Sequence, residues 1–141
     1  MDRKEKQIAA LPLFSGCRNA DIRWIASHAD ALDLRPGVVL AEAGEGTREF
    51  VVIVDGNASA GGETLASGDY FGHLGLIDQL PHDATIETTT RARALVFTAP
   101  AFHSLLDRCP GVARALMRGL VTDLRGADSR VVAGLELRTA W

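Results

Sequence analysis

The spacing of apolar side chains predicts a helix in the first block of the chain. Four apolar residues recur at the three- and four-residue intervals that place side chains on one helix face: Ile22, Ile25, Ala26 and Ala29. Asn19 is expected to be the N-cap, and Asp21 suits the first turn, where a carboxylate faces the positive end of the helix dipole. Residues 1–33 are therefore predicted to form an N-terminal helical segment.

Residues 34–99 carry the pattern of short strands separated by turns. Phe50 to Val54 is a continuous apolar run, which is typical of a strand covered on both faces. Ala84 to Thr90 alternates between apolar and polar side chains, as a half-exposed strand does. Turn-forming residues recur at intervals of roughly ten residues, a spacing typical of a sandwich or barrel. They are Pro36-Gly37, Gly44-Glu45-Gly46, Asp55-Gly56-Asn57, Gly61-Gly62 and Gly68-Asp69.

Residues 100–141 are predicted to form two further helices. Thr98 is suited to cap the first of them, and Pro110 stands where a proline opens a new helix. The second helix carries an apolar stripe that consists of Val112, Leu116, Leu120, Leu124, Ala127, Val131 and Leu135. The fold class expected from the three blocks is α+β.

Residues 68–85 read Gly-Asp-Tyr-Phe-Gly-His-Leu-Gly-Leu-Ile-Asp-Gln-Leu-Pro-His-Asp-Ala-Thr. This stretch resembles the phosphate-binding cassette of the cyclic-nucleotide-binding domain family, in which Gly-Asp-x-Phe-Gly-Glu-Leu-Ala-Leu precedes Pro-Arg-Ala-Ala-Thr. The matching residues are Gly68, Asp69, Phe71, Gly72, Leu74, Leu76, Pro81, Ala84 and Thr85. The resemblance implies a jelly-roll-like β-roll with a short N-terminal helical segment and two C-terminal helices, all in one domain.

The resemblance also implies where a ligand would bind. In the family, the cyclic phosphate lies at the N-terminus of a one-turn helix, where backbone N–H groups and the helix dipole favour an anion. The ligand-binding residues expected here are Phe71, Gly72, His73, Leu74, Gly75, His82, Asp83, Ala84 and Thr85. Possible ligands are cAMP, cGMP or another small anion, and no cofactor is expected.

Three cassette positions depart from the family pattern. His73 replaces the glutamate that takes the ribose hydroxyl, and His82 replaces the arginine that takes the phosphate. An arginine grips phosphate through a bidentate fork, whereas an imidazole offers one donor per nitrogen and is largely neutral at pH 7. Asp83 stands where the family has alanine, and at 4 Å and an effective dielectric near 20 its charge would repel a phosphate by about 4 kcal/mol.

These features leave three hypotheses for function. The first is a non-enzymatic regulatory module of the cyclic-nucleotide-binding type with weak or altered ligand binding. The second is an interaction or dimerisation domain that has lost its ligand. The third is a metalloenzyme that uses His73 and His82 beside Asp83. The first is favoured, with no catalytic and no metal site, because no Ser-His-Asp, Cys-His or P-loop pattern is present.

The last helix is the expected output of the module. In the family it either dimerises the domain or covers the pocket. The residues expected to pair with a symmetry mate are Val112, Leu116, Leu120, Leu124 and Val131. The alternative is that the first half of the helix packs on the roll and the rest is a tail. Because the helix-turn-helix of the family's transcription factors is missing, the chain is expected to act alone or as the sensor of a longer protein.

Composition narrows the possible partners. The 141 residues carry a formal charge of −3 and include only two lysines, Lys4 and Lys6, so nucleic-acid binding is not expected. No apolar run approaches the roughly 20 residues that span a bilayer, and the charged N-terminus does not resemble a signal peptide. Cys17 and Cys109 are too few for a disulfide framework, so two reduced, packed thiols in a cytoplasmic protein are expected.

Overall fold

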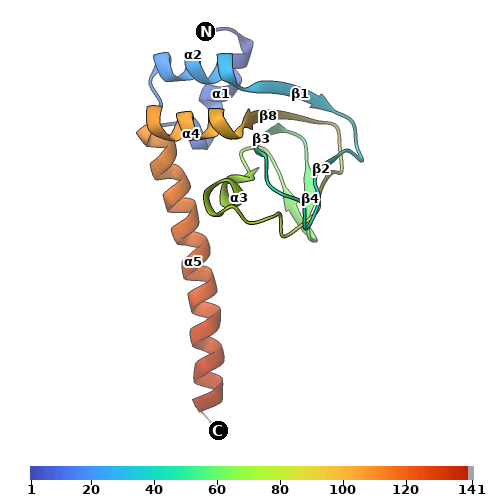
Figure 1. The fold of residues 1–141 in the computed structure, drawn as a ribbon, viewed down its shortest axis with the longest axis vertical. Coiled ribbons are helices and arrows are strands. Elements are labelled where there is room, and N and C mark those ends of the chain that lie inside the picture. Colours follow the sequence, from blue (N-terminus) through green and yellow to red (C-terminus); the bar gives the residue numbers. More distant parts are fainter. Residues whose placement is uncertain (140–141) are drawn as a thin grey trace.

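The computed structural model describes the backbone of residues 1–139 and the side chains of residues 1–127. Its order of elements is helical, then β, then helical (Figure 1). The first helical part contains α1 (Arg3–Ala10), the 3-10 turn η1 (Pro12–Phe14) and α2 (Asn19–His28). The last part contains α4 (Ala99–Arg108) and α5 (Pro110–Thr139). This architecture confirms the predicted α+β class.

Two four-stranded antiparallel sheets form the β-roll. One has the order β1-β8-β3-β6, from β1 (Asp30–Leu34), β8 (Ala92–Thr98), β3 (Glu49–Asp55) and β6 (Tyr70–Phe71). The other has the order β2-β7-β4-β5, from β2 (Val39–Ala41), β7 (Ile86–Thr88), β4 (Ala58–Ala60) and β5 (Glu63–Leu65). A single cassette helix, α3 (His73–Asp78), interrupts the strands between β6 and β7.

The continuous apolar run in β3 is explained by two cores on opposite faces of its sheet. Phe50 and Val52 belong to the helix-side core, which also holds Ile8, Phe14, Ile22, Ile25, Phe97, Phe102, Leu105, Val112 and Leu116. Val51 faces the roll core, which also holds Ala41, Ala58, Phe71, Ile86, Ala94 and Val96. Alternate side chains of one strand therefore stabilise both the roll and the packing of the helices on it.

Two sequence-based boundaries differ from the structure. The roll begins at Asp30, the first residue of β1, and not at residue 34, because every residue of β1 pairs with β8. Helix α2 begins one residue earlier than expected: Arg18 is the N-cap, and Asn19, the expected cap, is the first helical residue. The backbone N–H of Arg18 donates to the Asp21 carboxylate at 3.4 Å, so the start of the helix is held by Asp21.

The C-terminal helices begin where the sequence predicted. The Thr98 hydroxyl accepts a hydrogen bond from the Ala101 N–H at 3.2 Å and caps α4, and Pro110 opens α5. Only the first part of α5 packs on the domain, and the rest projects away from it as one long helix (Figure 1). Among the helices that the structure describes, none combines the length and apolar character needed to cross a bilayer.

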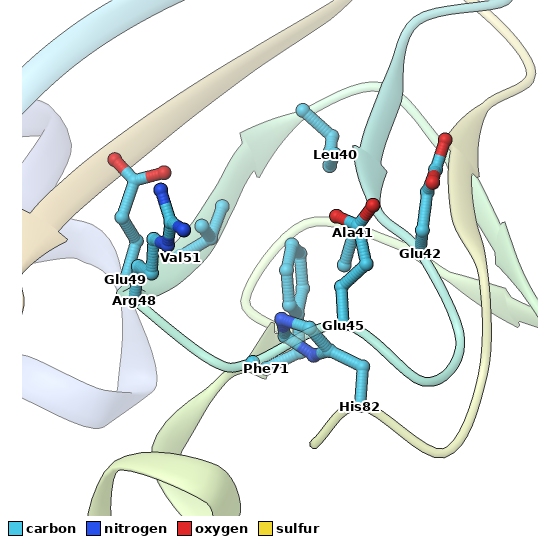
Figure 2. A pocket seen from close by; sticks show the side chains of 10 residues that line it. Leu40, Ala41, Glu42, Glu45, Arg48, Glu49, Val51, Phe71 and His82 are labelled. Carbon is cyan, nitrogen blue, oxygen red and sulfur yellow. The ribbon is translucent and has the colours of Figure 1, made fainter.

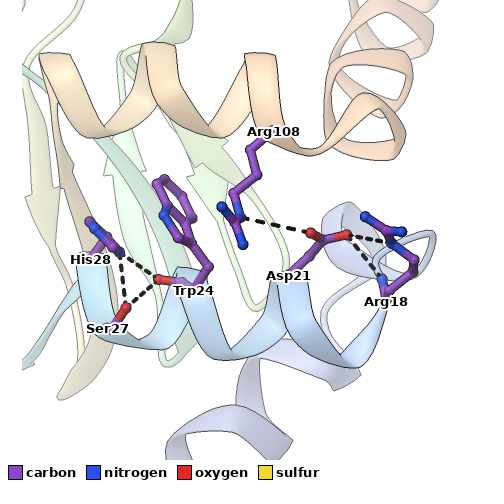
Figure 3. Close-up of polar contacts among 6 residues, drawn as sticks. All are labelled: Arg18, Asp21, Trp24, Ser27, His28 and Arg108. Carbon is purple, nitrogen blue, oxygen red and sulfur yellow. Dashed lines mark hydrogen bonds and ion pairs between the residues drawn. The ribbon is translucent and has the colours of Figure 1, made fainter.

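A polar cluster joins α2 to α4 on the outside of the helix-side core (Figure 3). Asp21 is only 5% exposed, and one of its carboxylate oxygens lies 3.9 Å from the Arg108 Nε. The Arg108 guanidinium also lies over the Trp24 ring, 5.5 Å from its centroid, and Trp24 stacks on His28. A charge pair and a cation–π contact therefore hold the two helices together.

Candidate functional site

Gly72 sets the backbone of the cassette. Its φ of 94° lies in the left-handed region, and a Cβ at this position would collide with the Glu49 carbonyl of β3. Helix α3 starts directly after it, and the Leu76 N–H donates to the Gly72 carbonyl at 3.1 Å. Leu76 is buried in the helix-side core and anchors the helix. Only glycine therefore allows α3 to begin so close to β3.

Gly75 is equally constrained, although the family pattern has an alanine at its position. A Cβ on Gly75 would collide with the Thr47 hydroxyl and would stand 2.6 Å from the Leu80 carbonyl oxygen. The loop that follows α3 therefore passes so close to the helix that even the methyl group of an alanine would not fit at position 75.

The segment after α3 is held by hydrogen bonds to the loop between β2 and β3. The His82 N–H donates to the Glu45 carbonyl at 2.9 Å, and the Gly44 N–H donates to the His82 carbonyl at 2.8 Å. The Thr85 hydroxyl oxygen accepts from the Ala43 N–H at 3.1 Å. The Thr85 oxygen thus holds the loop, and Thr85 does not line the cassette cavity.

The other cassette residues surround a cavity of about 390 Å³, here called the cassette cavity. It lies between α3, the loop after it and the β4–β5 hairpin. Of the predicted ligand-binding residues, those that line it are Phe71, Gly72, His73, Leu74, Gly75, His82, Asp83 and Ala84. The volume falls in the range of roughly 300–1,000 Å³ that small-molecule sites occupy.

The charges around the cassette cavity are unusual for an anion site. Its lining includes the carboxylates of Glu63, Asp78 and Asp83 but neither lysine nor arginine. All three acidic residues are exposed, so water screens them, and each would repel a phosphate at 4 Å by about 1 kcal/mol instead of the 4 expected from sequence. The lost bidentate arginine contact, worth about 1.5–3 kcal/mol, is the larger deficit.

His73 has a different environment from His82. The His73 ring lies edge-on to Tyr70, with centroids 5.0 Å apart, and edge-on to Phe50 at 6.3 Å. Its Nδ1 is buried and has no hydrogen-bond partner in the part of the chain that the structure describes. Burial lowers the pKa of His73, against the opposing effect of the Asp123 carboxylate on α5. His73 is therefore held neutral at pH 7.

A second cavity of about 460 Å³ opens beside the cassette cavity (Figure 2). Phe71 and His82 line both cavities and form the wall between them. Glu42 and Glu45 stand on one side of the second cavity, and Arg48 and Glu49 on the other. A hydrogen bond and charge repulsion from Glu45 raise the pKa of the Glu42 carboxyl.

The second cavity also holds a residue that sequence reasoning missed. Arg48 supplies a permanent positive charge to the lining of this cavity. The cassette motif begins at Gly68, after this loop in the sequence, and therefore gave no signal for Arg48, which the turn between β2 and β3 brings near only in three dimensions.

The metal-site hypothesis is contradicted by the arrangement of the histidines. Among the described residues, no three His, Cys, Asp or Glu side chains are grouped so that they could hold an ion. The His73 ring packs edge-on against Phe50 and Tyr70 instead of forming such a group with His82 and Asp83.

The two cysteines are neighbours inside the protein. Burial, together with the nearby Cys109 thiol, raises the pKa of the Cys17 thiol to about 12. Burial is also the main cause that raises the pKa of Cys109, and both cysteines are free thiols in the structure. A thiol with so high a pKa is a poor nucleophile at pH 7.

The apolar stripe of α5 divides into a buried and an exposed part, which corrects the expected dimer interface. Val112 and Leu116 are 0% and 2% exposed in the chain's own helix-side core, so they cannot pair with a symmetry mate. Leu120 is half-buried, and Leu124 is 61% exposed. The side chain of Val131 lies outside the described residues. Among the side chains of α5 that the structure describes, the other exposed apolar ones are Met117 and Val121.

A β-roll with a glycine-capped helix facing a small-molecule cavity defines a class of ligand-responsive modules, and comparison with known proteins identifies the family. The model of the cyclic nucleotide-binding domain matches residues 31–109. The cAMP-dependent protein kinase regulatory subunit of Schizosaccharomyces pombe is 30% identical over 131 residues, which cover 89% of this chain and 31% of that protein. The chain belongs to the cyclic nucleotide-binding domain family.

Solved structures share the fold. The catabolite activator protein of Thermus thermophilus has a TM-score of 0.75 and 22% identity, over 85% of this chain and 61% of that chain. A mutant regulatory subunit of a cAMP-independent protein kinase A from Trypanosoma brucei, bound to cAMP in its A site, has a TM-score of 0.73 and 18% identity. That match covers 83% of this chain and 46% of the other.

Proposed function

We propose that this chain is a non-enzymatic regulatory module that binds a cyclic nucleotide, cAMP or cGMP, weakly in the cassette cavity. The observation that carries the proposal is the intact cassette: Gly72 opens α3 onto a cavity of about 390 Å³. Its volume suits a small ligand, and its wall includes His82, which replaces the arginine of the family.

Weak binding at neutral pH follows from the side chains. The cassette cavity has no lysine or arginine in its lining, and His73 is held neutral in an apolar contact. His82 is half-buried and lines both cavities, so it is the cassette side chain best placed to meet a phosphate. Because a protonated imidazole attracts a phosphate, we expect tighter binding at pH 6 than at pH 8.

The output of the module is the position of α5. Tyr70 and His73, which line the cassette cavity, lie beside α5 at Gly119 and Asp123. A ligand shifts the equilibrium between two arrangements of α5 only by its difference in affinity for them. A ligand that binds weakly to both arrangements therefore shifts the equilibrium little. We place this activity in the cytoplasm, as expected from the reduced cysteines.

The second candidate function is a ligand-free interaction domain that forms homodimers through α5. The exposed side chains of Met117, Val121 and Leu124 favour it, because they form an uncovered apolar strip at helical spacing. The carboxylates around the cassette cavity also favour a ligand-free domain, because they would repel a phosphate.

Thermal unfolding with and without millimolar cAMP or cGMP, at pH 6 and pH 8, separates the two candidates. A ligand at 100 times its Kd adds about 2.7 kcal/mol of stability, which raises Tm by several degrees in a domain of this size. A shift that is larger at pH 6 supports the nucleotide sensor. With no shift at either pH, the ligand-free domain is the better description, and a dimer in light scattering that Leu124→Glu dissociates would support it.

A further inference from the structure

The contact between the cassette and α5 contains a half-buried histidine, His73, with one buried ring nitrogen. His73 is the first residue of α3, and its ring packs edge-on against Tyr70 and Phe50. The His73 Nδ1 is buried without a hydrogen-bond partner among the described residues. An orphaned polar atom in a native contact calls for a functional or structural reason.

Helix α5 closes this contact at a glycine. A Cβ on Gly119 would stand 2.7 Å from the Tyr70 hydroxyl oxygen, so the helix backbone passes close to the hydroxyl end of the Tyr70 side chain. Asp123, one turn further along α5, is the carboxylate that acts on both Tyr70 and His73. The charged and titratable groups that face the contact are therefore Tyr70 and Asp123, with Asp69 acting on Tyr70 from the start of β6.

Protonation changes the energetics of this contact. A neutral imidazole is tolerated beside Tyr70 and Phe50, because edge-on aromatic packing does not require a charge. A protonated ring would carry an Nδ1–H without an acceptor and a positive charge in an apolar contact, and both are costly to bury. The nearest opposite charge, Asp123, is exposed and screened by water, so it offsets only part of that cost.

We propose that the contact of His73 and Tyr70 with α5 is an acid-sensitive joint. Protonation of His73 moves its ring out of the contact into water and separates the Gly119–Asp123 turn of α5 from the cassette. The first turns of α5 stay in place, since Val112 and Leu116 remain buried in the helix-side core. The joint needs no ligand, so the inference goes beyond the proposed nucleotide sensing.

The test is an NMR titration of the ligand-free chain from pH 7.5 to pH 5, with the ring signals of His73 and the amide signal of Gly119 as readouts. Both signals should change with one shared midpoint, below the ordinary value of 6.5. His73→Gln should abolish the change at Gly119. His82→Gln, which removes the other cassette histidine, should leave it unchanged. Asp123→Asn should lower the midpoint of His73, because it removes the attraction that favours the proton.

Three outcomes would overturn the joint: a His73 midpoint at or above 6.5, a His73 titration that leaves Gly119 unchanged, or a Gly119 response that persists in His73→Gln. If His73→Gln does not fold, the test rests on Asp123→Asn, a change at an exposed residue. A His73 midpoint that is the same in this variant as in the parent chain contradicts the proposal. These readouts do not depend on nucleotide binding. A chain that fails the thermal-shift test with cAMP and cGMP therefore still tests the joint.

Discussion

Tyr70 and Gly119 are matched to each other: the Tyr70 hydroxyl oxygen occupies the space that any side chain at position 119 would need, 2.7 Å from the place of a Cβ. A glycine inside a helix costs about 1 kcal/mol relative to alanine. In α5 that cost is offset by the approach of Tyr70, which brings the cassette and the output helix into contact.

Gly119→Ala tests this match through a double-mutant cycle with Tyr70→Phe. Without the Tyr70 oxygen, the alanine should stabilise the chain by about 1 kcal/mol, since it restores helix propensity and meets no obstacle. With Tyr70 present, the gain should vanish or become a loss. Urea denaturation gives the four free energies of unfolding. An equal effect of Gly119→Ala in both backgrounds would show that the two residues do not interact.

Restoring a cation to the cassette should restore nucleotide affinity. The variant His82→Arg with Asp83→Ala adds a bidentate phosphate donor and removes an exposed carboxylate. We expect a gain in cAMP affinity of about 10- to 100-fold, measured by calorimetry at low salt. His73 is left unchanged, because a glutamate in its place would bury a carboxylate close to Asp123.

The control for this variant is His103→Arg with Asp107→Ala, which makes the same charge change at two exposed positions on α4. It should leave cAMP binding as it is in the parent chain. If the cassette variant gains no affinity, the cavity differs from a nucleotide site in shape as well as in side chains. An equal gain in both variants would instead point to a general effect of net charge.

The stability of the chain should depend on the protonation of His73 in acid. Burial lowers the pKa of His73 in the folded chain below its ordinary value of 6.5. The unfolded chain therefore binds more protons as pH falls below about 6.5, and this histidine destabilises the fold progressively in that range. Above that range it has no such effect.

Chemical denaturation of the parent chain and of His73→Leu, each between pH 7.5 and pH 5, measures this dependence. The parent should lose more stability than His73→Leu over the interval, because leucine cannot take up a proton. The exposed His103→Leu is the matched control and should follow the parent. Parallel curves for the parent and His73→Leu would mean that His73 titrates alike in both states.

Asp21 and Asp33, which both pair with arginines, should differ in their contribution to stability. Asp21 is buried, accepts from the Arg18 N–H and lies 3.9 Å from Arg108, so Asp21→Ala should cost about 1–3 kcal/mol. Asp33 pairs with Arg93 at the shorter distance of 2.9 Å, but its side chain is 81% exposed. Asp33→Ala should therefore cost less than about 1 kcal/mol.

Urea denaturation of the two single variants makes this comparison directly, and both proteins should keep the parent m-value. A larger loss for Asp33→Ala would mean that the length of an ion pair matters more here than its burial.

The sequence alone predicted the local backbone features of the chain. The glycine of the cassette, the threonine cap of α4 and the proline that opens α5 each act on neighbouring residues, so their effects can be inferred without knowing the fold. The same holds for the alternation in β7 and the apolar run in β3, which reflect burial on one or two faces of a sheet. These signals, with the cassette motif, were enough to identify the fold and the family.

Tertiary structure decided what surrounds each side chain. Sequence spacing put Val112 and Leu116 in the same stripe as Leu124, but packing buried the first two and left the third in water. His73 lines the cassette cavity together with His82, as expected, but its ring also lies edge-on to Tyr70 and is influenced by Asp123, 50 residues along the chain. Such contacts depend on the direction and register of distant elements, and no local preference encodes them. For this protein, the sequence determined the scaffold, and the three-dimensional packing determined which charges and rings meet within it.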